Sequence, residues 1–162
     1  MKSRAQRIVL GIDPGYGRLG FGVIRCGTKV EALAHGVITT ATHGEPASRL
    51  REIAADLRVV LTKYRPDLLV LEEIFFAKST TTALKVAEAR GVVMLLAAEA
   101  GVPIVNVKPN EVKLAVTGYG RADKRQIQQM VKTIFALASV PRPDDAADAL
   151  AIAYTGASLL LL

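Results

Sequence analysis

The sequence has a single cysteine, no tryptophan and no long run of apolar residues. Because one cysteine, Cys26, cannot form a disulfide within the chain, the composition fits a protein of the reducing cytoplasm. No stretch approaches the ~20 apolar residues that a membrane-spanning helix needs. The first apolar run, IVLGI, is short and Asp13 interrupts it. We therefore expect a cytoplasmic protein without a signal peptide or a membrane span.

Acidic residues are scarce relative to basic ones, since 15 Asp and Glu against 21 Lys and Arg give a net charge of +6. Such a protein is expected to bind a polyanion, either nucleic acid or an acidic membrane surface. Of the 162 residues, 51% are hydrophobic and 22% are charged, which predicts one globular domain over residues 1–162. A single domain must then carry the whole function.

The pattern of apolar residues predicts three strands followed by alternating helices and strands. The runs RIVLGID, FGVIRCG and KVEALAHGVITT predict an antiparallel meander at the N-terminus. From Pro46 onward, apolar residues recur at helical spacing until Pro66. A buried strand, DLLVL, comes next, and then a helix, TTTALKVAEARGVVMLLAAEAG, whose second half is apolar on almost every side. That helix is either buried or part of a subunit interface.

The C-terminal third predicts one more strand, PIVNV, and three helices. Asn110 is the expected cap of a short helix that contains Lys113. Asp123 with Gln126 three residues later predicts a capping box at the start of the next helix. The last helix begins within PRPDDAADALAIA. A meander followed by alternating strands and helices predicts an α/β fold, with one mixed sheet covered by helices on both faces.

The segment GYGRLG, residues 15–20, satisfies the glycine pattern of a dinucleotide-binding loop. That fingerprint requires a helix to begin within it, so that the pyrophosphate meets the helix N-terminus. Here the chain continues as FGVIRCG, another expected strand. A tight hairpin is the better interpretation.

Carboxylates stand at the ends of three predicted elements. They end the first strand (Asp13), end the strand DLLVL (Glu72 or Glu73) and open the last helix (Asp144, Asp145 and Asp148). Several carboxylates at the edge of an apolar core repel one another and raise their own pKa values. A hard divalent cation keeps them ionised, and Mg²⁺ fits because it prefers oxygen ligands. The two histidines, His35 in a strand and His43 in a loop, are not expected to be ligands.

Helix geometry narrows the last acidic cluster without choosing within it. Asp145 and Asp148 are three residues apart, and Asp144 and Asp148 are four apart, so either pair shares one helix face. For any one of these acids alone, a helix cap or a solvated charge is the simpler interpretation. Three acids together in a basic protein favour a metal site.

Four separated segments resemble one known family. They are, in order, IDPGYGRLGFGVI, LEEIFFAKSTTTALKVAEARGV, VKPNEVKLAVTGYGRADKRQIQQMV and DDAADALAIA. In order and spacing they are similar to the RuvC family of Holliday-junction resolvases, from about Val9 to Tyr154. The resemblance implies an RNase H-like fold with a mixed five-stranded sheet. It also implies a homodimer that cuts four-way DNA junctions symmetrically with Mg²⁺ or Mn²⁺.

The resemblance assigns the acids residue by residue. The family's catalytic carboxylates fall on Asp13, Glu72, Asp145 and Asp148. Asp144 is then left as the helix cap, and Glu73 is not assigned to a metal. Two metal ions are implied between the four groups, one lowering the pKa of the attacking water and the other stabilising the leaving 3′-oxygen. Such hydrolysis leaves 5′-phosphate and 3′-hydroxyl ends.

Basic and aromatic residues complete the implied site. Lys113 and Lys124 match lysines that the family uses near the scissile phosphate, where positive charge stabilises the transition state. Phe75 matches an aromatic residue that the family places against junction bases, although a core phenylalanine is the alternative. The residues expected to contact phosphates are Lys78, Arg121 and Arg125.

The expected partners follow from the symmetry of the substrate. A four-way junction has an approximate twofold axis, so a homodimer can present one active site to each of two opposed strands. The dimer surface is expected around Val92 to Leu96, and the family implies the branch-migration proteins RuvA and RuvB as partners. Two alternatives remain. One is an ATP-dependent phosphotransferase, because the actin and sugar-kinase superfamily also begins with an Asp and a Gly-rich hairpin; the other is a non-catalytic DNA-binding module.

Overall fold

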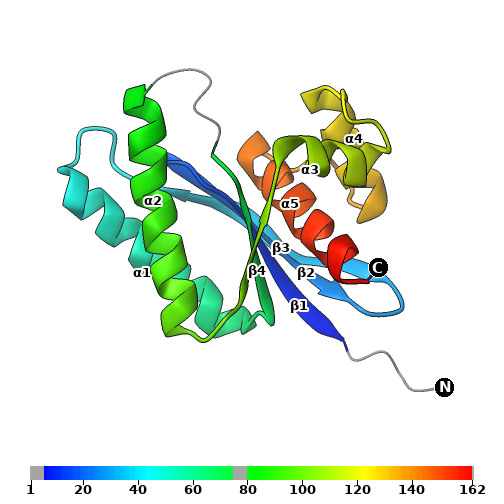
Figure 1. Ribbon diagram of the computed structural model, residues 1–162, viewed down its shortest axis with the longest axis horizontal. Helices are drawn as coiled ribbons and strands as arrows, with labels where there is room; N and C mark the ends of the chain where they lie inside the picture. Colours follow the sequence, from blue (N-terminus) through cyan, green and yellow to red (C-terminus); the bar gives the residue numbers. More distant parts are fainter. Residues whose placement is uncertain (1–5, 75–79, 162) are drawn as a thin grey trace.

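Five strands form a mixed sheet at the centre of the protein, and helices cover both of its faces (Figure 1). The computed structural model describes residues 6–74 and 80–161. The strand order is β3-β2-β1-β4-β5. The strands are β1 (Arg7–Asp13), β2 (Arg18–Cys26), β3 (Val30–Thr39), β4 (Leu68–Glu72) and β5 (Ile104–Val107). The helices are α1 (Pro46–Tyr64), α2 (Thr80–Glu99), α3 (Pro109–Thr117), α4 (Lys124–Ile134) and α5 (Asp144–Leu161).

The first three strands form the antiparallel meander that the sequence predicts, and β4 and β5 extend it with parallel pairs. The segment GYGRLG is a hairpin, because β1 ends at Asp13, β2 begins at Arg18, and Asp13 stands opposite Gly20. No helix begins within this segment, so the structure agrees with rejecting a dinucleotide-binding loop. The prediction of a mixed sheet with helices on both faces is confirmed.

Two hydrophobic cores lie on opposite faces of the sheet. Leu10 of β1 packs in the core under α1 and α2 together with Leu57. Its neighbour Val9 packs in the core under α3, α4 and α5, with Val131 and Leu150. Consecutive strand residues point to opposite faces, so one strand contributes to both cores. Within residues 6–74 and 80–161, no helix has the length and the hydrophobicity needed to cross a bilayer.

Helix α5 lies directly on β1 and β2 because glycines remove the side chains between them. A Cβ atom on Gly11 would lie 2.2 Å from the Ala149 oxygen, and one on Gly20 would lie 2.1 Å from the Asp145 oxygen. Both distances are far inside van der Waals contact, so glycine is required for this approach of backbone to backbone. Since Gly20 stands opposite Asp13, the contact sets the first turn of α5 beside the end of β1.

Two helix starts differ from the sequence predictions. Helix α3 begins at Pro109 after Lys108, and not after Asn110. Proline favours the first helical position because its φ is already helical and it has no N–H that needs a partner. Asp144 is the first residue of α5 and not its cap. Its carboxylate pairs instead with Lys124.

Candidate active site

Two carboxylates lie at the carboxyl ends of neighbouring parallel strands. Asp13 is the last residue of β1 and Glu72 the last residue of β4, and the parallel register of these strands brings the two residues to one edge of the sheet. Burial raises the pKa of Asp13 to about 8, and the charges of Asp148, Glu72 and Asp145 add to the rise. Burial also raises the pKa of Glu72 to about 7, with a further contribution from Asp148.

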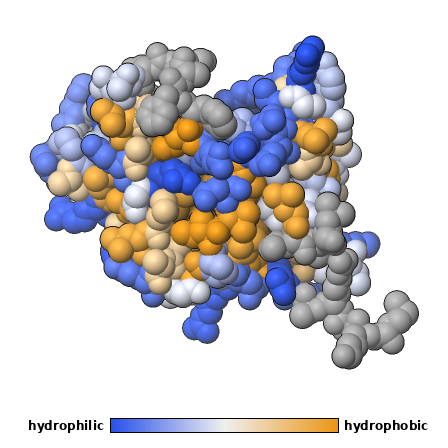
Figure 2. Space-filling view, viewed as in Figure 1, coloured by the Kyte–Doolittle hydropathy of each residue, from blue (hydrophilic) through white to orange (hydrophobic). Residues whose placement is uncertain are grey.

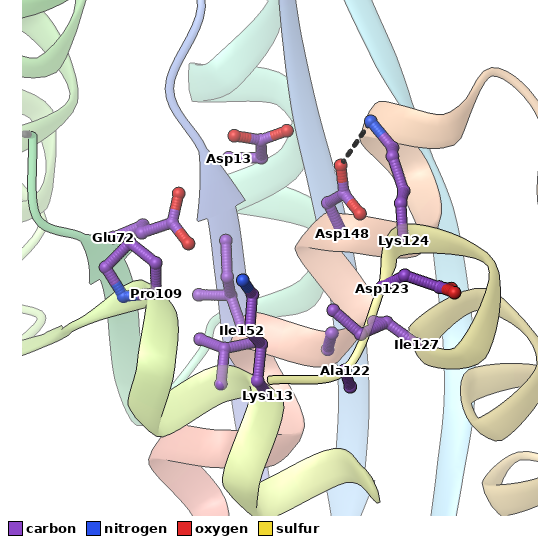
Figure 3. Close-up of a pocket in the computed structure, with 12 residues that line it drawn as sticks. Asp13, Glu72, Pro109, Lys113, Ala122, Asp123, Lys124, Ile127, Asp148 and Ile152 are labelled. Atoms are coloured by element: carbon purple, nitrogen blue, oxygen red, sulfur yellow. Dashed lines mark ion pairs between the residues drawn. The ribbon is translucent and has the colours of Figure 1, made fainter. Parts of the chain in front are cut away.

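A third acid of the site comes from α5. The carboxylate of Asp148 points toward the same space as those of Asp13 and Glu72 (Figure 3). These acids line a cavity of about 270 Å³, to which α3 contributes Lys113 and α4 contributes Lys124. Burial raises the pKa of Asp148 as well, although the charge of Lys124 opposes the rise. The cavity therefore gathers Asp13, Glu72 and Asp148 with two lysines, and Asp123, the N-cap of α4, is a fourth acid in its lining.

Asp145 lies beside this cavity and is held by a different cation. Its Oδ2 atom is 3.4 Å from Nε of Arg18, the first residue of β2. The same Oδ2 is buried and accepts no hydrogen bond from a described residue. A buried carboxylate oxygen without a hydrogen bond is costly, so it is a ready ligand for a cation. The negative charge of Asp145 is close enough to raise the pKa of Asp13.

The two lysines of the cavity have different surroundings. Nζ of Lys124 lies 2.5 Å from Oδ2 of Asp144 and 3.2 Å from Oδ2 of Asp148. The hydrogen bond with Asp144 is the largest of the effects that raise the Lys124 pKa. Lys113 points its amine into the cavity (Figure 3). Its charge opposes the rise in the Glu72 pKa.

The donor set suits a hard divalent cation. All four candidate ligands are carboxylates, and the pKa values of Asp13, Glu72 and Asp148 are raised, which a bound cation would reverse. Among the described residues, no three acidic, histidine or cysteine side chains already stand close enough to hold an ion. A cation bound here would favour the ionised forms of these carboxylates and bring them closer together.

A hydrogen-bonded cluster fixes the turn that follows Asp13. Nε of Arg49 donates to Oγ1 of Thr40 at 2.9 Å, and this hydroxyl donates to the Tyr16 carbonyl at 2.9 Å. The Arg49 guanidinium also lies 4.0 Å from the centroid of the Tyr16 ring. Helix α1 is thereby tied to the β1–β2 hairpin, a support for the site that the sequence did not indicate.

The structure brings together most of the residues that the sequence singled out. Five of them line one cavity: Asp13, Glu72, Asp148, Lys113 and Lys124. Arg125 lines a neighbouring cavity of about 420 Å³ on α4, and Arg121 is exposed in the loop before that helix. Phe75 and Lys78 lie outside the described residues.

Arg18 is a residue of the site that the sequence interpretation missed, although the strand pattern contained a signal for it. Gly20 faces α5, and residues two apart on a strand share a face. Arg18 therefore points toward the start of the same helix, where it meets Asp145. Recognising this pair requires knowing which face α5 covers, and the sequence alone does not show that.

Comparisons with known proteins agree on one family. The sequence profile described as "Crossover junction endodeoxyribonuclease RuvC" matches residues 9–156. RuvC of Heliobacterium modesticaldum is 50% identical over 147 residues, which are 90% of this chain and 91% of that protein. RuvC of Thermotoga maritima is 47% identical over 147 residues, covering 90% and 88% of the two chains. The solved structure of T. thermophilus RuvC in complex with a Holliday junction substrate superimposes with a TM-score of 0.90 at 40% identity, covering 95% of this chain and 94% of that one.

The sheet topology and the position of the acids define an RNase H-like α/β protein. Within that class, the chain belongs to the RuvC family of crossover junction endodeoxyribonucleases. The resemblance found in the four sequence segments is confirmed, and so is the expected fold. Family membership decides against both the phosphotransferase and the non-catalytic DNA-binding module.

Proposed function

We propose that the protein resolves four-way (Holliday) DNA junctions by metal-dependent phosphodiester hydrolysis, in homologous recombination and DNA repair. Its membership in the RuvC family supports this function, and so does its likeness to a relative solved with a junction. The observation that carries the proposal is the cavity itself, where acids from β1, β4 and α5 meet lysines from α3 and α4. We place the whole activity in one domain over residues 1–162, in the cytoplasm.

Four carboxylates are proposed to hold two divalent cations, Mg²⁺ with Mn²⁺ as a substitute: Asp13, Glu72, Asp145 and Asp148. The chemistry that such ions supply when bound is an attacking water of lowered pKa and stabilisation of the leaving 3′-oxygen, which gives 5′-phosphate and 3′-hydroxyl ends. The protein's part is to hold the acids in position and deprotonated. Lys113 and Lys124 place positive charge where the phosphate gains negative charge in the transition state.

The DNA surface is proposed to continue from the cavity onto α4. The cavity lined by Asp13, Glu72 and Asp148 is called the metal cavity from here on. The neighbouring cavity shares Ala122 and Asp123 with it and is lined by Arg125. Arg121 is exposed in the preceding loop. Both arginines can contact phosphates on either side of the cut. Lys78 and Phe75 belong to the same proposal, as a phosphate contact and as a stacking partner for a junction base.

A homodimer through α2 is proposed from the exposed apolar side chains of that helix. Val93 and Leu96 are buried within the protomer, but Leu84 is 56% exposed and Leu95 is 58% exposed. Apart from its own helix, no described residue lies within 4 Å of a Cβ atom placed on Gly91, which leaves room for a second helix to approach. Figure 2 shows hydrophobic residues along α2 and over the strands beside it. RuvA and RuvB are proposed as further partners on the basis of the family.

The test is cleavage of a mobile four-way junction beside a linear duplex of the same sequence, with and without Mg²⁺. Paired, symmetric nicks in the junction alone, dependent on Mg²⁺, would support the proposal. Equal nicking of the linear duplex would show a nuclease without junction selectivity. Binding with no cleavage under any divalent cation would contradict the enzymatic function.

A further inference from the structure

Lys124 has two acidic partners on α5, and they belong to different parts of the site. Its Nζ lies 2.5 Å from Oδ2 of Asp144 and 3.2 Å from Oδ2 of Asp148. Asp148 lines the metal cavity, whereas Asp144 does not line it. One ammonium group thus joins a proposed metal ligand to an acid that the proposed mechanism does not use.

The two partners must respond differently when the site binds a cation. Asp148 can give its oxygens to the cation, whose positive charge then repels the Lys124 ammonium. Asp144 is not one of the four proposed metal ligands, so its pairing with the Lys124 ammonium does not compete with the cation. After metal binding, Asp144 is the remaining acid that holds the ammonium at the rim of the cavity.

The backbones that carry this pair are both fixed. Lys124 is the first residue of α4, and that helix begins with a capping box: Gln126 N–H donates to Oδ1 of Asp123 at 2.8 Å, and Asp123 N–H donates to Oε1 of Gln126 at 2.8 Å. Asp144 is the first residue of α5, which is held against the glycines of β1 and β2. The freedom that remains is that of the long lysine side chain, which is 55% exposed. Its ion pairs with Asp144 and Asp148 reduce the number of positions that the ammonium samples.

We infer that Asp144 is a positioning residue, which keeps the Lys124 ammonium beside the scissile phosphate after a cation has taken Asp148. This inference rests on the proposed function and on the role proposed for Lys124. Asp144 does not touch the reacting atoms; it acts through the lysine. Beside the proposed DNA surface, its negative charge would also oppose binding of the phosphate backbone. Its removal should therefore slow cleavage while leaving affinity unchanged or slightly tighter.

The experiment compares Asp144→Asn with the wild-type chain in single-turnover cleavage of a four-way junction at saturating Mg²⁺. We expect the rate constant to fall about tenfold, because the ammonium is no longer held in place. The dissociation constant for the junction, measured without divalent cation, should stay equal or fall by about twofold. A loss of folding would weaken binding as well, so the opposite signs separate positioning from damage.

A double-mutant cycle with Lys124→Met shows whether Asp144 acts through the lysine. In the Lys124→Met background, Asp144→Asn should change the rate by less than about twofold, since there is no ammonium left to hold. Asp144→Glu should recover most of the wild-type rate. Glu73→Gln is the matched control, because it removes one acid next to Glu72 that forms no ion pair with a described residue.

Three outcomes would overturn the inference. They are a wild-type rate in Asp144→Asn, a faster rate in that variant, and an equal loss in the presence and absence of Lys124. A faster rate would mean that Asp144 withholds the lysine from the substrate. If the wild-type chain itself fails to cut the junction, the proposed function fails, and the same experiment shows this separately.

Discussion

The acids at the strand ends and the acids of α5 are stabilised in different ways. Neither Asp13 nor Glu72 forms an ion pair with a described residue, and burial raises the pKa of both, to about 8 and about 7. In α5, Asp145 pairs with Arg18, while Asp144 and Asp148 share Lys124. Asp13 and Glu72 are thus shifted toward their protonated forms and lack a cationic partner among the described residues. The three acids of α5 each have a cationic partner, although burial still raises the pKa of Asp148.

This difference determines which positive charges a bound metal ion would have to displace from each group of acids. At the strand ends, a cation must displace protons, so the cost of binding depends on pH. At the helix, it must displace or reorient Arg18 and Lys124, so the cost depends on two ion pairs. The predictions below separate these two costs, beginning with the largest expected effect.

Replacing one acid from each half should abolish cleavage to a similar extent. Asp13→Asn and Asp145→Asn each remove a proposed metal ligand, and we expect single-turnover rates at least about 10³-fold below wild type. Both variants should still bind a synthetic four-way junction. Asp56→Asn, an exposed acid on α1, is the control. Retained cleavage by Asp145→Asn in Mg²⁺ would contradict the assignment of that residue.

The raised pKa of Asp13 should make the free energy of unfolding depend on pH. Folding raises the pKa of Asp13 from 3.8 to about 8. Between these two pH values, the folded protein keeps a proton on Asp13 that the unfolded chain has lost. The free energy of unfolding therefore falls as pH rises through this range. Without metal, Asp13→Asn should stabilise the protein by about 2 kcal/mol or more at pH 8, and by nothing near pH 4.

Urea unfolding in EDTA at several pH values measures this effect. Asp144→Asn is the contrasting variant, because Lys124 lowers the pKa of Asp144 and so favours its ionised form. It should bring no stabilisation at any pH. A gain for Asp13→Asn that is independent of pH would count against the raised pKa.

The amount of Mg²⁺ that cleavage requires should depend on pH. Since Asp13, Glu72 and Asp148 have raised pKa values, protons compete with the cation on the acid side of neutrality. We expect the half-saturating Mg²⁺ concentration to fall about tenfold between about pH 6 and about pH 8. Cleavage rates over a Mg²⁺ series at each pH provide the measurement. A flat profile would mean that these groups are already ionised.

Arg18→Gln should have the smallest effect. The ion pair with Asp145 spans 3.4 Å and Arg18 is 53% exposed, so the stability change should stay within about 0.5 kcal/mol. With its competitor removed, Asp145 should bind metal slightly better, and half-saturating Mg²⁺ should fall by about twofold. Arg25→Gln, which breaks the exposed Arg25–Glu31 pair between β2 and β3, should leave the Mg²⁺ requirement unchanged.

The sequence predicted which helices and strands form better than it predicted where each helix begins. The helix from Pro46, the strand DLLVL and the capping box at Asp123 all appear in the structure, because strong local patterns determine them. Asn110 and Asp144 were both taken as caps, and both lie inside their helices. A favourable cap residue can stand at several neighbouring positions, and tertiary contacts decide which one is used.

The site was predictable in composition but not in its internal pairing. Acids at element ends indicated a metal centre, since several carboxylates at the edge of an apolar core repel one another unless a cation neutralises them. Spacing alone left Glu72 against Glu73 and Asp144 against Asp145 open, and only the family resemblance chose between them. The pairs of Arg18 with Asp145 and of Lys124 with Asp144 join residues far apart in the chain. They depend on the register of β2 and on the placement of α5, which no local pattern contains.

The close packing of α5 on the glycines of β1 and β2 also sets when the site can exist during synthesis. Because α5 follows every strand of the sheet in the chain, the ribosome exposes its acids only after β1 and β4 have emerged. The earlier segments can pair and collapse, but they hold only the acids of the strand ends. A partly synthesised chain therefore holds Asp13 and Glu72 without Asp145 and Asp148, and the proposed set of four carboxylates is complete only once α5 has been made.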